Sequence, residues 1–124
     1  MLIDIPKKKK EKKEKKIKKV NKRVEERKLD EMWKKKVKER DKYMCQVCQK
    51  KVDGKNCQAH HILPRGIKGC RWDIENGITL CYQHHKVGHY SAHLNAIWFA
   101  FWFKTNKPTQ FRYIVNKLVE LDKK

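Results

Sequence analysis

Two short pairs of metal-ligating residues constrain the fold of this chain more than any other feature. Cys45 and Cys48 form a C-x-x-C pair, and Cys81 and His84 repeat its spacing with histidine in the last position. Three cysteines and one histidine suit tetrahedral Zn²⁺, and a structural zinc site is closed by four ligands. The surrounding segment, residues 43–90, is loop-rich and too small to fold by burial alone. The sequence therefore predicts a structural zinc at these four residues.

A second set of ligands remains once these four are assigned. If a helix begins near residue 82, His85 and His89 lie one turn apart on one face. His60 and His61 are adjacent in a predicted strand and would point to opposite faces. We expect one of them to join His85 in holding a cation while the other faces a substrate. The alternative is that these histidines are surface residues or have ordinary hydrogen-bond partners.

Two details of the ligand assignment stay open. His84 and His85 are neighbours and can exchange roles. Cys57 and Cys70 are extra cysteines, and either can enter the zinc site if the assignment above is wrong. Otherwise we interpret Cys57 as a buried thiol and Cys70 as a loop residue.

The charge of the chain indicates a polyanionic partner. The 33 Lys and Arg outnumber the 14 Asp and Glu, giving a formal charge of +19. Such an excess favours nucleic acid, and less often an anionic membrane surface. Residues 7–42 carry much of it and have sparse apolar residues at helical spacing, which predicts a long solvated helix docked near Met32 to Val37. A disordered basic tail over residues 1 to about 20 is the alternative, because like charges repel.

The remaining pattern indicates a protein of the cell interior with further helices at its C-terminus. No apolar run approaches the roughly 20 residues needed to span a bilayer, and Leu2, Ile3 and Ile5 do not form a signal-peptide core. An intracellular location then favours metal ligands or free thiols over disulfides. Residues 91–124 predict two helices separated at Pro108, with Leu94, Ile97, Trp98, Phe101 and Trp102 at helical spacing in the first. Packing against the core is the preferred role of these aromatics, and base stacking the alternative.

The ordered motif resembles the HNH endonucleases of the ββα-metal fold, in their zinc-bearing phage-type branch. The resemblance covers roughly residues 33–95 and is carried by the C-x-x-C pair, by HHI at 60–62, by NGITLC at 76–81 and by the two adjacent histidines that follow. It implies an α+β fold: a small ββα-metal core with a structural zinc, a long basic N-terminal helix and C-terminal helices. We expect a basic arm at 1–32, the nuclease core at 33–95 and a helical packing segment at 96–124.

The resemblance also implies roles for single residues. His61 matches the general base, and Asn76 the residue that braces the loop before the second strand. His60 and His85 match ligands of a catalytic divalent ion, and His89 matches a further ligand found in some members. Three cations in the loop are candidate phosphate contacts, with solvated loop charges as the alternative: Arg65, Lys68 and Arg71.

The function implied is a metal-dependent DNA endonuclease, with nicking of one strand left open. A neutral imidazole at His61 can take a proton from water, and a single divalent ion, Mg²⁺, Mn²⁺, Ni²⁺ or Zn²⁺, would assist the leaving oxygen. The expected products are 5′-phosphate and 3′-hydroxyl ends. The alternatives are a non-catalytic zinc module that binds nucleic acid, and an RNA nuclease. A phage origin would place the protein in the cytoplasm of a bacterial host; the oligomeric state is not predicted.

Overall fold

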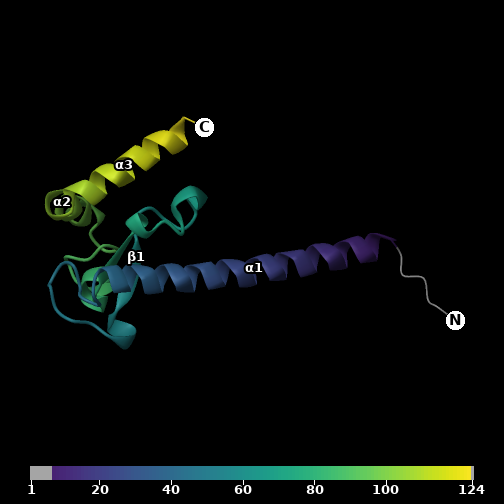
Figure 1. Ribbon diagram of the computed structural model, residues 1–124, viewed down its shortest axis with the longest axis horizontal. Helices are drawn as coiled ribbons and strands as arrows, with labels where there is room; N and C mark the ends of the chain where they lie inside the picture. The colour runs from purple at the N-terminus through teal and green to yellow at the C-terminus, as the bar shows by residue number, and fades with distance from the viewer. Residues whose placement is uncertain (1–6, 124) are drawn as a thin grey trace.

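The computed structural model describes residues 7–123, except for the side chain of Lys68, and shows a small α+β core carrying one very long helix (Figure 1). The elements in chain order are α1 (Lys7–Arg40), β1 (Gln58–His61), β2 (Gly77–Leu80), the π-helix η4 (Gln83–Val87), α2 (Ala96–Asn106) and α3 (Pro108–Asp122), with 3₁₀ turns η1 (Gly54–Asn56), η2 (Lys68–Cys70) and η3 (Ile74–Asn76) in the loops. The predicted fold class, a ββα-metal core with a long basic helix and C-terminal helices, is confirmed.

The sheet has two antiparallel strands. Gln58 pairs with Leu80 and His61 with Gly77, so the ladder spans four residues on each side. Every residue of β2 is buried, whereas those of β1 are all half-buried. Residues 62–76 form a long loop between the strands. Helix α1 contacts both strands directly, and α1 and α3 both contact η3 in this loop. An isolated bridge between Met44 and Lys51 closes the hairpin of the first cysteine pair.

Helix α1 docks on the sheet through its last two turns. Trp33 and Val37 are its buried residues, whereas Met32, expected at the docking site, is 53% exposed. Gly77 makes the close contact possible: a Cβ at this position would lie 2.5 Å from Val37 and 2.6 Å from Trp33. The helix is continuous from Lys7, so the alternative of a disordered tail is wrong for residues 7–20, and residues 1–6 lie outside the described part.

The end of α1 is also fixed to the sheet by hydrogen bonds. The guanidinium of Arg40 donates to the carbonyl of Gly77 at 2.6 Å and to that of Ile74 at 2.8 Å. Asp41, paired with Arg40, accepts from the amide of Thr79 at 2.8 Å. These bonds connect the residues just before the first cysteine pair to both ends of β2, so α1 and the metal-binding segment form one unit.

The two C-terminal helices cover the core as expected, but with a different face. Phe99, Phe103 and Ile114 are buried in the core, so both helices pack on it. Ile97 and Phe101, which the helical spacing had placed in the contact, are 87% and 71% exposed. Pro108 begins α3, where a residue without an amide proton costs no hydrogen bond. Within the described residues, none of the helices combines the length and apolar character needed to cross a bilayer.

Candidate metal centres and active site

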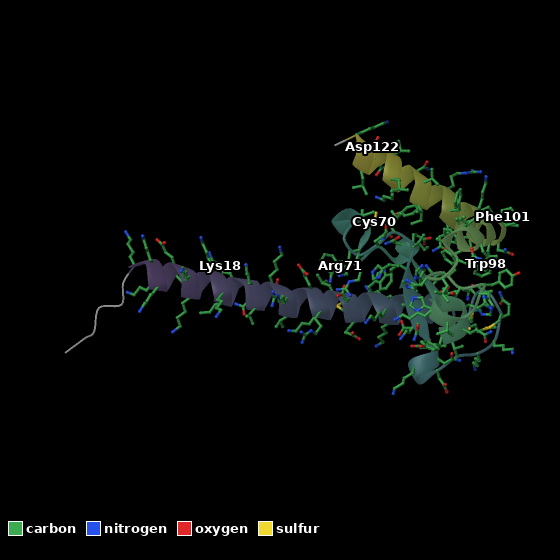
Figure 2. All side chains as sticks on the ribbon, turned by 180° about the vertical axis from the view of Figure 1, so that it is seen from behind. Lys18, Cys70, Arg71, Trp98, Phe101 and Asp122 are labelled. Carbon is green, nitrogen blue, oxygen red and sulfur yellow. The ribbon has the colours of Figure 1, made fainter. Side chains whose placement is uncertain are left out.

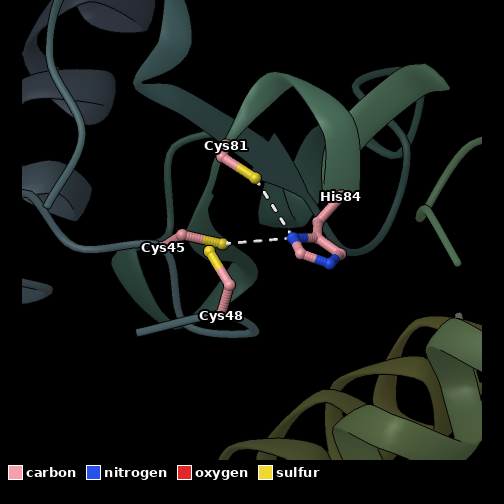
Figure 3. A group of neighbouring side chains, drawn as sticks. All are labelled: Cys45, Cys48, Cys81 and His84. Atoms are coloured by element: carbon pink, nitrogen blue, oxygen red, sulfur yellow. Dashed lines mark hydrogen bonds between the residues drawn. The ribbon is translucent and has the colours of Figure 1, made fainter. Parts of the chain in front are cut away.

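The first cluster consists of the four residues predicted to hold zinc (Figure 3). The ligand atoms of Cys45, Cys48, Cys81 and His84 all lie within 4.8 Å of one another. The Nδ1 of His84 lies 3.1 Å from the Sγ of Cys81 and 3.8 Å from that of Cys45. The cluster is closed by protein on most sides, because Cys45 and Cys81 are buried and the other two are half-buried.

The donor set of this cluster fits zinc. Burial raises the pKa of the Cys45 thiol to about 11, so a thiolate at this position needs a cation beside it. A dication bound by three sulfurs and one imidazole supplies that charge and has the composition of a closed structural site. Cys57 and Cys70 are buried elsewhere and are not members of the cluster. The open choice between adjacent histidines is therefore settled geometrically: His84, not His85, meets the cysteines.

The second cluster contains three histidines from three different segments. The Nε2 of His85 lies 3.1 Å from the Nδ1 of His60 and 3.0 Å from the Nε2 of His93. Two nitrogens bound to one ion at ~2.1 Å and at about a right angle are separated by ~3.0 Å, so these spacings suit a shared metal. His85 is buried, His60 is half-buried and His93 is exposed, which leaves one side of the cluster open.

The protonation of this cluster also suits a cation. Burial, with the neighbouring imidazoles adding to it, lowers the pKa of His60 to about 3 and that of His85 to about 4. Both rings are therefore neutral near pH 7 and offer lone pairs. The Nδ1 of His85 contacts the carbonyl oxygen of the Gln58 side chain, which can only accept, so the proton sits on Nδ1 and Nε2 is free for a metal. The sequence analysis did not single out Gln58.

His93 stands where the sequence predicted His89. The helix after Cys81 is a π-helix that ends at Val87, and the amide of Gly88 donates back to the carbonyl of Gln83. His89 therefore does not follow His85 by one helical turn and is not part of the cluster. The chain instead returns so that the amide of His93 donates to the carbonyl of His85 at 3.1 Å, which brings the two rings together.

His61 lies outside both clusters and is held in a single orientation. Its Nε2 lies 2.9 Å from the carbonyl oxygen of Arg71, which accepts, so Nε2 carries the proton and Nδ1 keeps its lone pair. The indole of Trp33 stacks on the ring with centroids 3.7 Å apart and planes 8° apart. Burial is the main cause that lowers the pKa of His61, so the ring stays neutral at neutral pH.

Asn76 holds the loop that carries the Arg71 carbonyl. Its side chain is fully buried and accepts from the amide of Leu63 at 2.7 Å. It donates to the carbonyls of Leu63 and Cys70 at 3.1 and 3.0 Å. The two ends of the loop are thus joined through one amide group, next to the residue whose carbonyl orients His61.

Comparison with known proteins identifies this arrangement. Residues 45–87 match the family described as HNH endonuclease. This segment of the chain is similar to the HNH endonucleases. The match begins at the first cysteine pair and ends with the π-helix, so it contains both strands, His61 and Asn76, and three of the imidazole ligands of the two clusters. It does not reach α1 or His93. No curated protein and no solved structure matches the chain.

The basic residues of the loop between the two strands, residues 62–76, have different contacts. Arg71 makes an ion pair with Asp30 at 2.7 Å and another with Glu26 at 3.1 Å, both from α1. This finding differs from the expectation of a phosphate contact: Arg71 fastens the loop to the helix. The Arg65 side chain is 64% exposed, and its distance of 4.0 Å from Asp30 is at the limit of an ion pair, so its charge is available at the surface. The side chain of Lys68 lies outside the described part.

A cleft of about 870 Å³ connects the HNH residues with the two flanking parts of the fold. His60, His61, His85 and His93 all line it, although His60 and His61 are adjacent in β1. One wall is contributed by α1 and the opposite, apolar wall by α2 and α3, and the basic residues in the lining are Lys34, Lys38, Arg65 and Lys86. The cleft therefore places cations and imidazoles around the same space.

Proposed function

We propose that the chain is a metal-dependent endonuclease that hydrolyses phosphodiester bonds in DNA. The observation that carries this proposal is the orientation of His61, whose Nε2 proton is engaged by the Arg71 carbonyl while Nδ1 keeps a lone pair. That tautomer is the one a general base requires. The three-imidazole cluster lines the same cleft, which supports a function in which base and cation act on one substrate.

The reaction is assigned to residues as follows. His61 takes a proton from water, the resulting hydroxide bonds to phosphorus, and the bond from phosphorus to the 3′ oxygen breaks. The departing 3′ oxygen takes a proton from solvent water and His61 returns its proton to solvent, leaving 5′-phosphate and 3′-hydroxyl ends. A divalent ion held by His60, His85 and His93 would neutralise the phosphate and assist the departing oxygen. Nitrogen ligands suit Mn²⁺, Ni²⁺ or Zn²⁺, whereas Mg²⁺ prefers oxygen. Lys34, Lys38, Arg65 and Lys86 would attract the phosphodiester backbone into the cleft.

The structural zinc is a separate part of the proposal. Cys45, Cys48, Cys81 and His84 would hold it, and no open ligand position is needed because its role is to fold the segment. The chemistry is then confined to the imidazole cluster and His61.

The test is relaxation of a supercoiled plasmid by the full-length protein at low salt. With Mn²⁺ or Mg²⁺, wild type should nick or cut the plasmid and His61→Ala should lose at least 100-fold in rate, while its circular dichroism and zinc content stay unchanged. Structured RNA in a parallel reaction separates a DNA enzyme from an RNA enzyme. Strong binding to DNA without His61-dependent cutting by either metal would favour the non-catalytic zinc module instead.

A further inference from the structure

The N-terminal part of α1 projects away from the rest of the fold (Figure 2). Lys18 stands on this projecting part, whereas Arg71 lies where the helix meets the core. All residues from Lys7 to Glu25 are exposed. Among the described residues, Glu26 is the first in the helix whose side chain bonds to another element, at 3.1 Å from Arg71. Within residues 7–123 the projecting part therefore forms no side-chain bond to the rest of the fold.

Its charge opposes its own folding. Residues 7–29 contain fourteen Lys or Arg and four Glu. Like-charged residues four apart on a helix destabilise it, and pairs such as Lys8 with Lys12 and Lys12 with Lys16 recur along this part. A polyanion laid against the helix relieves that repulsion, so binding and helix stability are coupled here.

Some of the cations of α1 lie on one face of the helix. Lys34 and Lys38 line the cleft one turn apart. At 100° per residue, four more cations lie within about 20° of Lys34 and continue this face toward the N-terminus. We call the six residues the cationic track: Lys38, Lys34, Arg27, Arg23, Lys16 and Lys9.

The acidic residues of the projecting part avoid this face. Glu11, Glu14 and Glu25 lie roughly 140–180° around the helix from Lys34 in the same geometry. Asp30, which does lie on the track's side, is bound to Arg71. Glu31 contacts Lys34 at 3.3 Å, but both side chains are largely exposed, and such pairs contribute little.

We propose that duplex DNA lies along the cationic track. The protein would then contact the duplex on only one side of the phosphodiester bond that lies in the cleft. The track leads from the cleft in a single direction, because α1 projects from one side of the core (Figure 1). From Lys34 to Lys9 an α-helix rises ~38 Å, which is about 11 base pairs of B-form DNA. The position of the cleaved bond rests on the proposed function, whereas binding along the track does not.

A membrane surface fits this helix less well than a duplex does. A helix lying in a membrane interface needs a broad apolar face opposite its basic one. The apolar residues of the projecting part, Ile17, Val20 and Val24, form only a thin stripe among lysines. Phosphate groups spaced along a rigid rod match a straight row of cations, so the duplex is the partner that we test.

The binding test compares two triple variants with the same change in charge, both in full-length His61→Ala protein so that the DNA stays intact. The track variant is Lys16→Gln, Arg23→Gln and Arg27→Gln; the control is Lys18→Gln, Lys22→Gln and Lys28→Gln, from the other faces. For a 30-base-pair duplex, the slope of log K against log salt should fall by about 2.7 in the track variant and by less than 1 in the control. Equal losses in both variants would overturn the track.

Hydrogen exchange supplies a structural readout of the same binding. Amides of residues 10–25 should exchange at least ten-fold more slowly with the duplex bound, and much less so with a 10-base-pair duplex or with anionic vesicles. Protection by vesicles and not by DNA would also overturn the proposal, in favour of a membrane surface.

The one-sided contact is tested by where wild-type protein cuts a linear duplex of 40 base pairs labelled at one end. On each strand, cuts should stop about 11 base pairs short of one end and continue close to the other, and the track variant should lose this asymmetry. Cuts distributed symmetrically but still dependent on His61 would overturn the one-sided contact and leave the proposed function standing. Absence of cutting would overturn the proposed function, and the binding test would still decide the track.

Discussion

The indole ring of Trp33 lies flat against the imidazole of His61, and the two residues come from α1 and β1. Trp33 also donates its Nε1 proton to the carbonyl of Asp73 at 2.7 Å, in the loop whose Arg71 carbonyl binds His61. Asp30, one turn before Trp33, fixes the Arg71 side chain. The ring of the proposed base is thus held on its face by α1, which lies outside the segment that matches the HNH family, and on its edge by a loop that α1 fixes in place.

Trp33 should therefore act as a positioning residue that shifts the pH dependence of cleavage. Neutral His61 is the active form, and burial keeps its pKa below the ordinary value of 6.5. In Trp33→Leu water reaches the ring, the pKa rises toward 6.5, and more of the base is protonated at pH 6. The acid limb of the profile of kcat against pH should move to higher pH, and kcat should fall about ten-fold.

Two variants control for a general loss of structure. Trp33→Phe keeps a ring over His61 and loses only the bond to Asp73, so its acid limb should stay near that of wild type. Met32→Leu changes an exposed neighbour on the same helix and should match wild type throughout. An unshifted acid limb in a folded Trp33→Leu protein would refute the positioning role.

His93 and His89 should differ sharply in their effect on metal binding. His93→Ala removes one of three converging nitrogens, so Mn²⁺ affinity should fall by on the order of ten-fold or more, with cleavage falling in parallel. His89→Ala removes an imidazole outside the cluster and should leave both nearly unchanged. Calorimetric titration with Mn²⁺ of zinc-loaded proteins measures the difference, and a larger loss in His89→Ala would restore the ligand set expected from the sequence.

Loss of a single sulfur should have opposite consequences at two cysteines. Cys45→Ser removes a ligand of the proposed zinc, so the domain should lose its bound zinc and its cooperative thermal transition. Cys57→Ala removes a buried sulfur outside the cluster and should retain stoichiometric zinc with a destabilisation of about 1 kcal/mol. Elemental analysis and thermal unfolding measure both; full zinc content in folded Cys45→Ser protein would contradict the assignment.

Stability should depend on pH through His60. Its pKa in the folded chain is about 3, against about 6.5 for an exposed imidazole. Between pH 6 and pH 4 the unfolded state binds a proton that the folded state does not, so the free energy of unfolding falls as the pH falls. In His60→Leu the number of protons taken up on unfolding should drop by about one across this window. Chemical denaturation of both zinc-loaded proteins tests this, and equal pH slopes would show that His60 is not buried in neutral form.

The features predicted best from sequence are those fixed by local spacing. Cysteine pairs three residues apart can close only around a common centre, so the zinc-type cluster was predicted with all four members. The two-stranded sheet was implied by the resemblance to the ββα-metal fold, and it forms between residues 58–61 and 77–80. Asn76 was expected to brace the loop, and its buried amide joins both loop ends.

The predictions differ from the structure where tertiary contacts determine which residues meet. His89 was expected in the cluster from an α-helical step, but the π-helix changes the step and the turn after Gly88 selects His93. In α2 the run AIWFAFWF is apolar on every side, so its spacing does not specify which face is buried. Arg71 was assigned to phosphate because its partners on α1 are 41 and 45 residues away in sequence.

Gly77 limits how this protein can be divided into parts for protein engineering. Helix α1 rests directly on the backbone there, so even an alanine would lift the helix off the strand. The same small displacement would separate the Trp33 ring from the His61 ring, and it would move the N-terminal end of the long helix α1 by many ångströms. The projecting part of α1, the Trp33 ring over His61 and the sheet should therefore be transferred to another protein together. Variants with a larger residue at position 77 should lose the docking of α1, the stacking on His61 and the packing of the sheet at once.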